Sequence, residues 1–148
     1  VYPDARNEFG ETALMLAGNS KTIAKYLVRY GADVNARNQI LTTPLMYAML
    51  QDKLFIPKLL IAGGADVNAT DQWGRTALMV AAFEGKTKFI KLLIAAGAEA
   101  EVRDQFGKKA LNYAIDAEQK EAAKILREEM YKKWLSGYVS ILIPVEER

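Results

Sequence analysis

The 148-residue chain contains no cysteine and no histidine. It therefore has no thiol nucleophile, disulfide, imidazole base or Cys/His ligand set for a transition metal. No run approaches 18 consecutive apolar residues, so we expect no membrane-spanning helix. The 20 basic and 18 acidic residues are scattered and leave a formal charge of +2, without a basic stripe that would predict nucleic-acid binding. We expect no cofactor, no metal and no nucleic-acid partner.

Two short motifs recur along the chain in one register. The first is Thr-x-Leu-Met-x-Ala in three of its four copies, which start at Thr12, Thr43, Thr76 and Lys109. The second starts at Gly31, Gly64 and Gly97, and after the first copy both motifs recur every 33 residues. Regular self-similarity of this length indicates a repeat architecture, in which each unit packs only on its neighbours.

Each repeat carries the signals of two helices. Apolar residues spaced by three and four, such as Ile56, Leu59 and Leu60, predict a buried helix face. The motif threonines precede such runs and are candidate N-caps, while Pro44 fits a first helical position. The motif glycines follow the second helix, where a left-handed residue ends it. Asn38, Asp71 and Asp104 lie in the next turn, where their side chains can bond nearby backbone.

These motifs resemble the ankyrin repeat family, whose pattern is about 33 residues with a T-P-L-H-x-A core, over roughly residues 4–130. The resemblance implies an all-α solenoid of stacked helix–turn–helix units, with projecting hairpin loops and a concave face. Methionine stands at the family's usual histidine position, at Met15, Met46 and Met79. Because methionine packs rather than bridging loops by strong hydrogen bonds, we expect the family's histidine network to be absent.

We expect one array over residues 1–137, with repeats at about 6–37, 38–70, 71–103 and 104–137. The first repeat is two residues short between its motifs, so its first helix should be clipped. Leu41 and Asp52 replace glycines, so the loops of the second repeat should differ in shape. The last repeat should be a polar C-terminal cap with a helix over roughly 120–135. Residues 1–5 align with the end of a repeat, which suggests that the array begins earlier in a longer chain.

The C-terminal segment, residues 138–148, follows a different pattern. Val139, Ile141, Ile143 and Val145 are β-branched and alternate, which predicts an extended apolar tail after a helix that ends at Ser136–Gly137. Three roles stay open for this tail. It folds back as part of the cap, pairs edge to edge with another chain, which would give self-association through residues 138–148, or stays loose until a partner docks. Pro144 limits continuous edge pairing.

The candidate partner-binding surface comprises the hairpin tips and the groove between them and the first helices. One tip position in each repeat is large and apolar, flanked by arginine and glutamine, side chains suited to interfaces. We expect Trp73 to be the strongest contact, with Phe83 beside it. The predicted residues are Phe9, Arg37, Gln39, Ile40, Gln72, Trp73, Arg75, Phe83, Arg103, Gln105 and Phe106. By analogy with the family, Leu50, Gln51, Glu84, Asp116 and Ala117 also face the groove.

The pattern favours a non-catalytic module that binds another protein. The alternatives are a structural, regulatory or targeting segment of a longer array, supported if the N-terminal end exposes an apolar patch around Leu14, Leu16 and Ile23, and an enzyme built on scattered carboxylates, which we do not expect. The repeat form resembles bacterial ankyrin proteins. We expect a cytoplasmic location, or a periplasmic or secreted one if a leader was removed before Val1.

Overall fold

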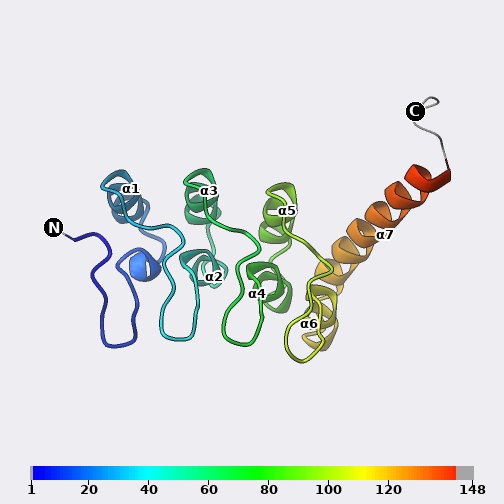
Figure 1. The fold of residues 1–148 in the computed structure, drawn as a ribbon, viewed down its shortest axis with the longest axis horizontal. Coiled ribbons are helices and arrows are strands. Elements are labelled where there is room, and N and C mark those ends of the chain that lie inside the picture. The colour runs from blue at the N-terminus through cyan, green and yellow to red at the C-terminus, as the bar shows by residue number, and fades with distance from the viewer. Residues whose placement is uncertain (1, 143–148) are drawn as a thin grey trace.

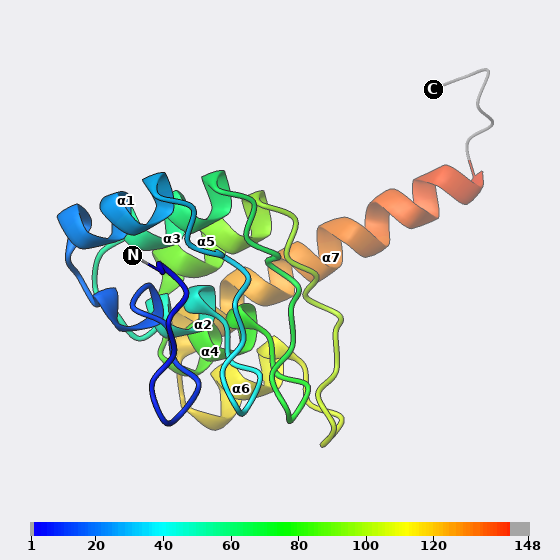
Figure 2. The same ribbon diagram turned by 60° about the vertical axis from the view of Figure 1, so that its left-hand side comes forward.

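The computed structural model describes residues 2–142 and shows helix pairs stacked in two layers (Figures 1 and 2). One layer holds the first helix of each pair: η1 (Met15–Ala17), α2 (Pro44–Ala48), α4 (Ala77–Phe83) and α6 (Ala110–Asp116). The other holds α1 (Lys21–Arg29), α3 (Phe55–Ala62), α5 (Thr87–Ala95) and α7 (Lys120–Leu142). Loops project from one side of the stack, and the described residues form no strand beyond an isolated Arg6–Thr12 bridge. The predicted all-α architecture is confirmed.

Motif threonines cap two of the four first helices, α2 and α4. At Thr12 the hydroxyl accepts a longer bond of 3.5 Å from the Met15 N–H, while η1 itself begins after Leu14 without a side-chain cap, and α6 begins after Lys109. The hydroxyls of Thr43 and Thr76 each accept a bond from a backbone N–H three residues on, both at 3.3 Å. Pro44 occupies the start of α2, where its missing N–H costs nothing. Both threonines are buried, so their capping bonds also satisfy groups that water cannot reach.

Each hairpin is shaped by one Asn or Asp side chain. Asn7, Asn38, Asp71 and Asp104 each accept two backbone N–H bonds through Oδ1, from residues two and four positions later. Successive hairpins are then joined by backbone bonds from Gln39, Gln72 and Gln105 to the preceding apolar tip residue. The loops therefore form a bonded row, although methionine replaces the family's histidine.

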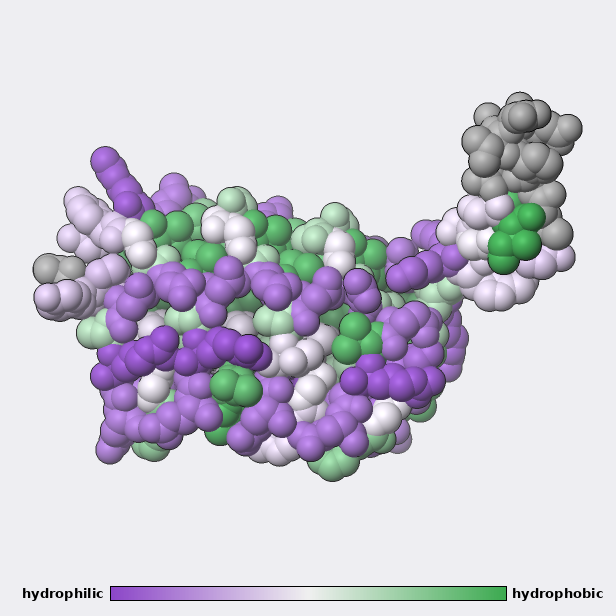
Figure 3. Space-filling view, in the orientation of Figure 1, coloured by the Kyte–Doolittle hydropathy of each residue, from purple (hydrophilic) through white to green (hydrophobic). Residues whose placement is uncertain are grey.

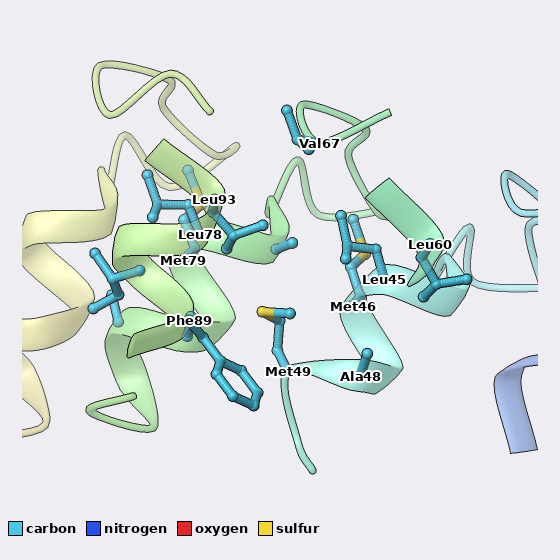
Figure 4. Close-up of a cluster of buried hydrophobic side chains, with 14 of the residues drawn as sticks. Leu45, Met46, Ala48, Met49, Leu60, Val67, Leu78, Met79, Phe89 and Leu93 are labelled. Carbon is cyan, nitrogen blue, oxygen red and sulfur yellow. The ribbon is translucent and has the colours of Figure 1, made fainter. Parts of the chain in front are cut away.

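The core lies between neighbouring pairs of helices. Small alanines at positions 48, 81 and 114 are at most 3% exposed and let the helices approach closely. Figure 4 shows Met49 and Phe89 pointing into the space between the second and third repeats. Met15, Met46 and Met79 are also buried, as their apolar thioethers favour.

The prediction that Ser136–Gly137 end the last helix is wrong, because α7 continues to Leu142. The extended-tail prediction is therefore wrong for residues 138–142, and its remainder, 143–148, lies outside the described residues. Helix propagation costs little once a nucleus exists, and the first half of α7 packs on α5 and α6. That anchoring outweighs the roughly 1 kcal/mol cost of a glycine within a helix.

Both loops of the second repeat were predicted to differ in shape from those of other repeats. The hairpin at Leu41 does not differ, whereas the loop between the helices at Asp52 does. Leu41 adopts φ 62°, close to the 75° and 77° of Gly10 and Gly74, so its hairpin keeps the left-handed turn despite carrying a side chain. Between the helices, Asp52 is not left-handed as Gly85 is, and α2 has five residues where α4 has seven. The first helix of the first repeat is clipped to the single turn of η1, as predicted.

The N-terminal face of the stack exposes apolar side chains that are buried elsewhere. Ile23 is 52% exposed, whereas the equivalent Ile56 and Phe89 are 3% and 4% exposed because a preceding repeat covers them. Leu16, Tyr26 and Tyr30 are also exposed, while Leu14 is buried in the core. The N-terminal end therefore presents a stacking face without a neighbour.

We expect Ile56→Ala to destabilise the chain by about 2–5 kcal/mol, because it leaves a cavity between repeats. The equivalent Ile23→Ala should cost less than about 1 kcal/mol, because the side chain is already half in solvent. Urea denaturation followed by circular dichroism measures both. Equal losses would contradict this account of the N-terminal face.

Candidate protein-binding surface

A groove of about 440 Å³ opens on the side of the first helices, where the second and third repeats meet. Helices α2 and α4 form its floor, and the two hairpins that precede them form one wall. Its lining residues are Ile40, Thr42, Met46, Tyr47, Leu50, Asp71, Arg75, Met79, Val80, Phe83, Glu84 and Tyr113.

The apolar surface of the groove comes from equivalent positions in successive repeats. Leu50 and Phe83 are 33 residues apart. Leu50 lies just beyond the end of α2 and Phe83 is the last residue of α4, and their side chains are 55% and 51% exposed. Met46 and Met79 are buried and also line the groove. The repeat period thus places two large apolar side chains on one surface, and the equivalent position in the fourth repeat is Asp116, where the apolar row stops.

Tyr113 brings a hydroxyl to the groove and donates it to Asp104 Oδ2. Partial burial and the adjacent carboxylate raise the pKa of Tyr113 to about 12. Burial alone would raise the pKa of Asp104, but bonds from the Tyr113 hydroxyl and the N–H groups of Lys108 and Phe106, with the Lys108 charge, bring it below its usual value. The hydroxyl is therefore protonated and fixed in direction at neutral pH.

Tyr47 occupies the equivalent position in the second repeat and is held by two partners. Its hydroxyl donates to Glu11 of the first repeat and accepts from Asn38 Nδ2 at 3.2 Å. Burial, followed by the bond to Glu11 and its charge, raises the pKa of Tyr47. The bond from Tyr47, aided by Asn7, lowers the pKa of Glu11. Both tyrosines are half-buried and line the groove.

The third repeat has Val80 at this position, so no tyrosine hydroxyl bonds to the Asp71 carboxylate, and Arg75 bonds to it instead. Arg75 Nε donates to Asp71 Oδ2 at 2.8 Å, and its guanidinium lies 4.6 Å from the centre of the Trp73 ring. Asp71 is thus neutralised within the array. Trp73 is half-buried under Arg75, so the residue predicted as the strongest contact offers less free surface than Phe83.

The predicted site residues divide into two groups. Ile40, Arg75 and Phe83 line the groove together. The others lie on the hairpins, where the two phenylalanines, Phe9 and Phe106, are 58% and 68% exposed.

Several polar hairpin side chains bond to neighbouring backbone. Gln39 and Gln105 donate to carbonyls of the preceding hairpin, at 2.7 and 2.9 Å. Arg37 donates to the carbonyl of Thr70, and Arg103 to that of Gly107. These four side chains have defined roles in holding the hairpins, which leaves them fewer donors for a partner. The exposed polar face of the tips remains visible beside the apolar side chains in Figure 3.

The sequence predicts Leu50 on the groove side only through the family resemblance and does not assign Met46, Met79 or Val80 to this surface. The available signal was their period: Tyr47, Val80 and Tyr113 are 33 residues apart, as are Leu50 and Phe83. The pattern could not show that the shortened α2 and the missing tyrosine at Val80 leave an open space there.

A family model described as ankyrin repeats (3 copies) matches residues 1–71 and 45–135. None of the curated proteins matches the chain. Across the described residues, no helix combines the length and the apolar composition that crossing a bilayer requires.

Asp104→Asn should preserve the fourth hairpin, because Oδ1 still accepts both N–H groups and Nδ2 can donate to Tyr113 as Asn38 does to Tyr47. Loss of the negative charge should lower the pKa of Tyr113 toward the ordinary value of about 10. The wild-type chain should lose this contribution to stability as pH rises from 10 to about 12, because the folded state holds the proton more tightly.

Tyrosinate absorbance against pH measures the shift, with Tyr113→Phe identifying the late step. Asp104→Ala is the contrasting variant and should cost about 1–3 kcal/mol, since it leaves backbone groups of the hairpin unpaired. A late titration step unchanged in Asp104→Asn would contradict the assignment.

Proposed function

We propose that this chain, which belongs to the ankyrin repeat family, is a non-catalytic module that binds another protein in the groove between its second and third repeats. Ankyrin repeats are generally protein–protein interaction modules, and the match to three of them covers most of the chain. The observation that carries the proposal is the pair of exposed side chains, Leu50 and Phe83, at the mouth of one apolar groove.

The groove is suited to a large apolar anchor from a partner. Its volume of about 440 Å³ falls within the usual range for ligand-binding pockets. Its floor is rigid, because it consists of buried residues of packed helices rather than a free loop. An aliphatic or aromatic side chain seated there would bury Leu50 and Phe83, which favours binding through the hydrophobic effect.

Polar groups at the edge of the groove would orient the partner by hydrogen bonding to its backbone or polar side chains. The Tyr47 and Tyr113 hydroxyls are oriented by acidic partners, while Glu84 is exposed at the edge. Phe9 and Phe106 on the hairpin tips extend this surface in both directions along the array. We therefore retain the tips as secondary contacts and place the centre of the interface at the boundary between repeats two and three.

Three of the carboxylates available for acid–base catalysis, Glu101, Asp104 and Asp116, have structural partners instead. Asp104 holds its hairpin and Tyr113, Asp116 pairs with Lys108 at 2.7 Å, and Glu101 pairs with Lys109. General acid–base catalysis needs two carboxyl groups held at a controlled separation in one cleft. This use of the carboxylates, together with the typically non-catalytic character of the family, supports a binding role.

The double variant Leu50→Ala/Phe83→Ala should weaken binding of a groove partner at least tenfold, because both anchors at the mouth are removed. Affinity capture from the source cells, followed by titration of each captured protein, measures the change. Tyr2→Ala, which removes an exposed aromatic ring outside the proposed contact surfaces, is the control. Trp73→Ala and Phe106→Ala test the tips separately. Equal recovery by wild type and the double variant would exclude the groove as the site.

A second candidate role is favoured by the N-terminal face, where Ile23, Tyr26 and Tyr30 are exposed. We propose that this face stacks against another ankyrin-type repeat, because equivalent side chains are covered by such a repeat at every internal boundary. In this role the chain is a segment of a longer structural array.

Joining one ankyrin repeat with a polar outer face ahead of Val1 should raise the thermal midpoint by several degrees, since it buries the exposed face. The same extension on an Ile23→Lys/Tyr26→Lys chain is the control and should give a smaller gain. A midpoint that does not change on extension would contradict the stacking role.

A further inference from the structure

The second half of α7 lies outside the array. Its first half packs on α5 and α6, where Leu126 is fully buried. Every residue from Tyr131 to Ile141 is exposed, and the helix projects freely beyond the stack (Figures 1 and 2). A helical segment of this length is only marginally stable in water without packing, so contact with a second surface would stabilise it.

The uncovered half carries a continuous apolar ridge. Leu126, Met130, Trp134 and Tyr138 are spaced by four and follow one row along the helix. The row is covered by the array at Leu126 and has no cover at Trp134 and Tyr138, which are 60% and 49% exposed. Helices α5 and α6 therefore cover only the first part of the apolar ridge, and the ridge continues beyond them along α7.

The aromatic rings on this half are already ordered against one another. Tyr131 stacks on Trp134 with ring centres 5.9 Å apart, and Trp134 stacks on Tyr138 at 5.5 Å. Leu135 and Ile141 extend the same side. Figure 3 shows an apolar patch at the projecting end. Rings held in place lose little further entropy when a second surface packs on them.

We propose that this face, formed by Tyr131, Trp134, Leu135, Tyr138 and Ile141, pairs with the same face of a second copy of the chain as a helix–helix contact. The inference is independent of the groove. It keeps self-association, one of the three roles left open for the C-terminal segment, but replaces strand pairing by helix packing.

The charges favour a second copy over a lipid surface. Lys132 and Lys133 are the charged residues between positions 130 and 142, and both lie on the side of the helix away from the aromatic ridge. Pairing the ridges therefore brings no like charges together. An anionic membrane would meet Lys132, Lys133 and Arg127, but Glu128 and Glu129 lie in the same preceding turn as Arg127, so residues 127–142 carry three basic and two acidic charges and would attract such a surface only weakly.

The area is also adequate for a weak dimer. The three rings together expose on the order of 300 Å², and the aliphatic residues raise the apolar face to about 500 Å². Two copies would bury about 1,000 Å², the lower end for a specific interface. A two-fold axis would make the contact self-complementary, because each ridge supplies the same residues.

Sedimentation velocity of the whole chain from about 1 µM to about 500 µM tests the proposal. The average mass should rise toward twice 16.5 kDa with concentration. Trp134→Ala/Tyr138→Ala should stay at the monomer mass across this range while circular dichroism remains helical, because alanine favours helix. Tyr2→Ala removes an exposed aromatic ring at the other end of the array, outside the proposed interfaces, and should dimerise as wild type does.

Fluorescence gives a second readout. Trp73→Phe leaves Trp134 as the sole tryptophan, and its emission should shift to the blue over the same concentration range. A wild-type chain that stays monomeric, or a dimer that survives Trp134→Ala/Tyr138→Ala, would overturn the proposal. So would a monomer whose Trp134 shifts only with phosphatidylserine vesicles, which would assign the face to lipid. Leu50→Ala/Phe83→Ala should dimerise normally, which separates failure here from failure of the groove.

Discussion

Burial of each repeat against its neighbour is the interaction on which the structure depends. Within residues 2–142, no pair of helices is large enough to cover its own apolar faces, so the buried side chains of one repeat rest on those of the next. Phe89 and Met49, which meet between the third and second repeats, show the arrangement. This dependence explains why the two ends of the array differ chemically from its interior. For the same reason, an exposed apolar surface at either end of the array indicates a place where a further surface can pack.

The hairpins add a second, polar form of order to this stack. One Asn or Asp side chain shapes each loop, and a backbone bond to the next loop joins it to the row. In the two aspartates, the second carboxylate oxygen does not bond to the hairpin backbone, and its partner differs between the repeats. Asp104 receives a tyrosine hydroxyl, whereas Asp71 receives an arginine. Because the third repeat carries Val80 in place of tyrosine, the groove opens there, and a change in one repeated position creates a local site on a regular scaffold.

The sequence predicted the fold to the level of individual caps. Its period located the helix pairs, Thr43 and Thr76 at their N-caps, and Gly31, Gly64 and Gly97 in left-handed conformations. The groove was predicted in part, because side-chain identity gave Phe83 and Ile40 but not the depth between α2 and α4. That depth depends on where α2 ends and on how neighbouring side chains share space, which a one-dimensional period does not contain. Leu41 illustrates the same limit, since the surrounding hairpin imposes a turn that the leucine alone disfavours.

The end of α7 shows how tertiary anchoring decides between two local patterns. Residues 138–142 alternate as a strand does, yet Tyr131, Trp134 and Tyr138 fall at helical spacing and stack within one helix. A strand at this place would leave its backbone N–H and C=O groups without partners in the chain, whereas a helix satisfies them internally. The helix nucleated on α5 and α6 extends those internal bonds one residue at a time. The same extension carries an apolar ridge past the end of the array, so the interaction that settles the secondary structure also creates the exposed face.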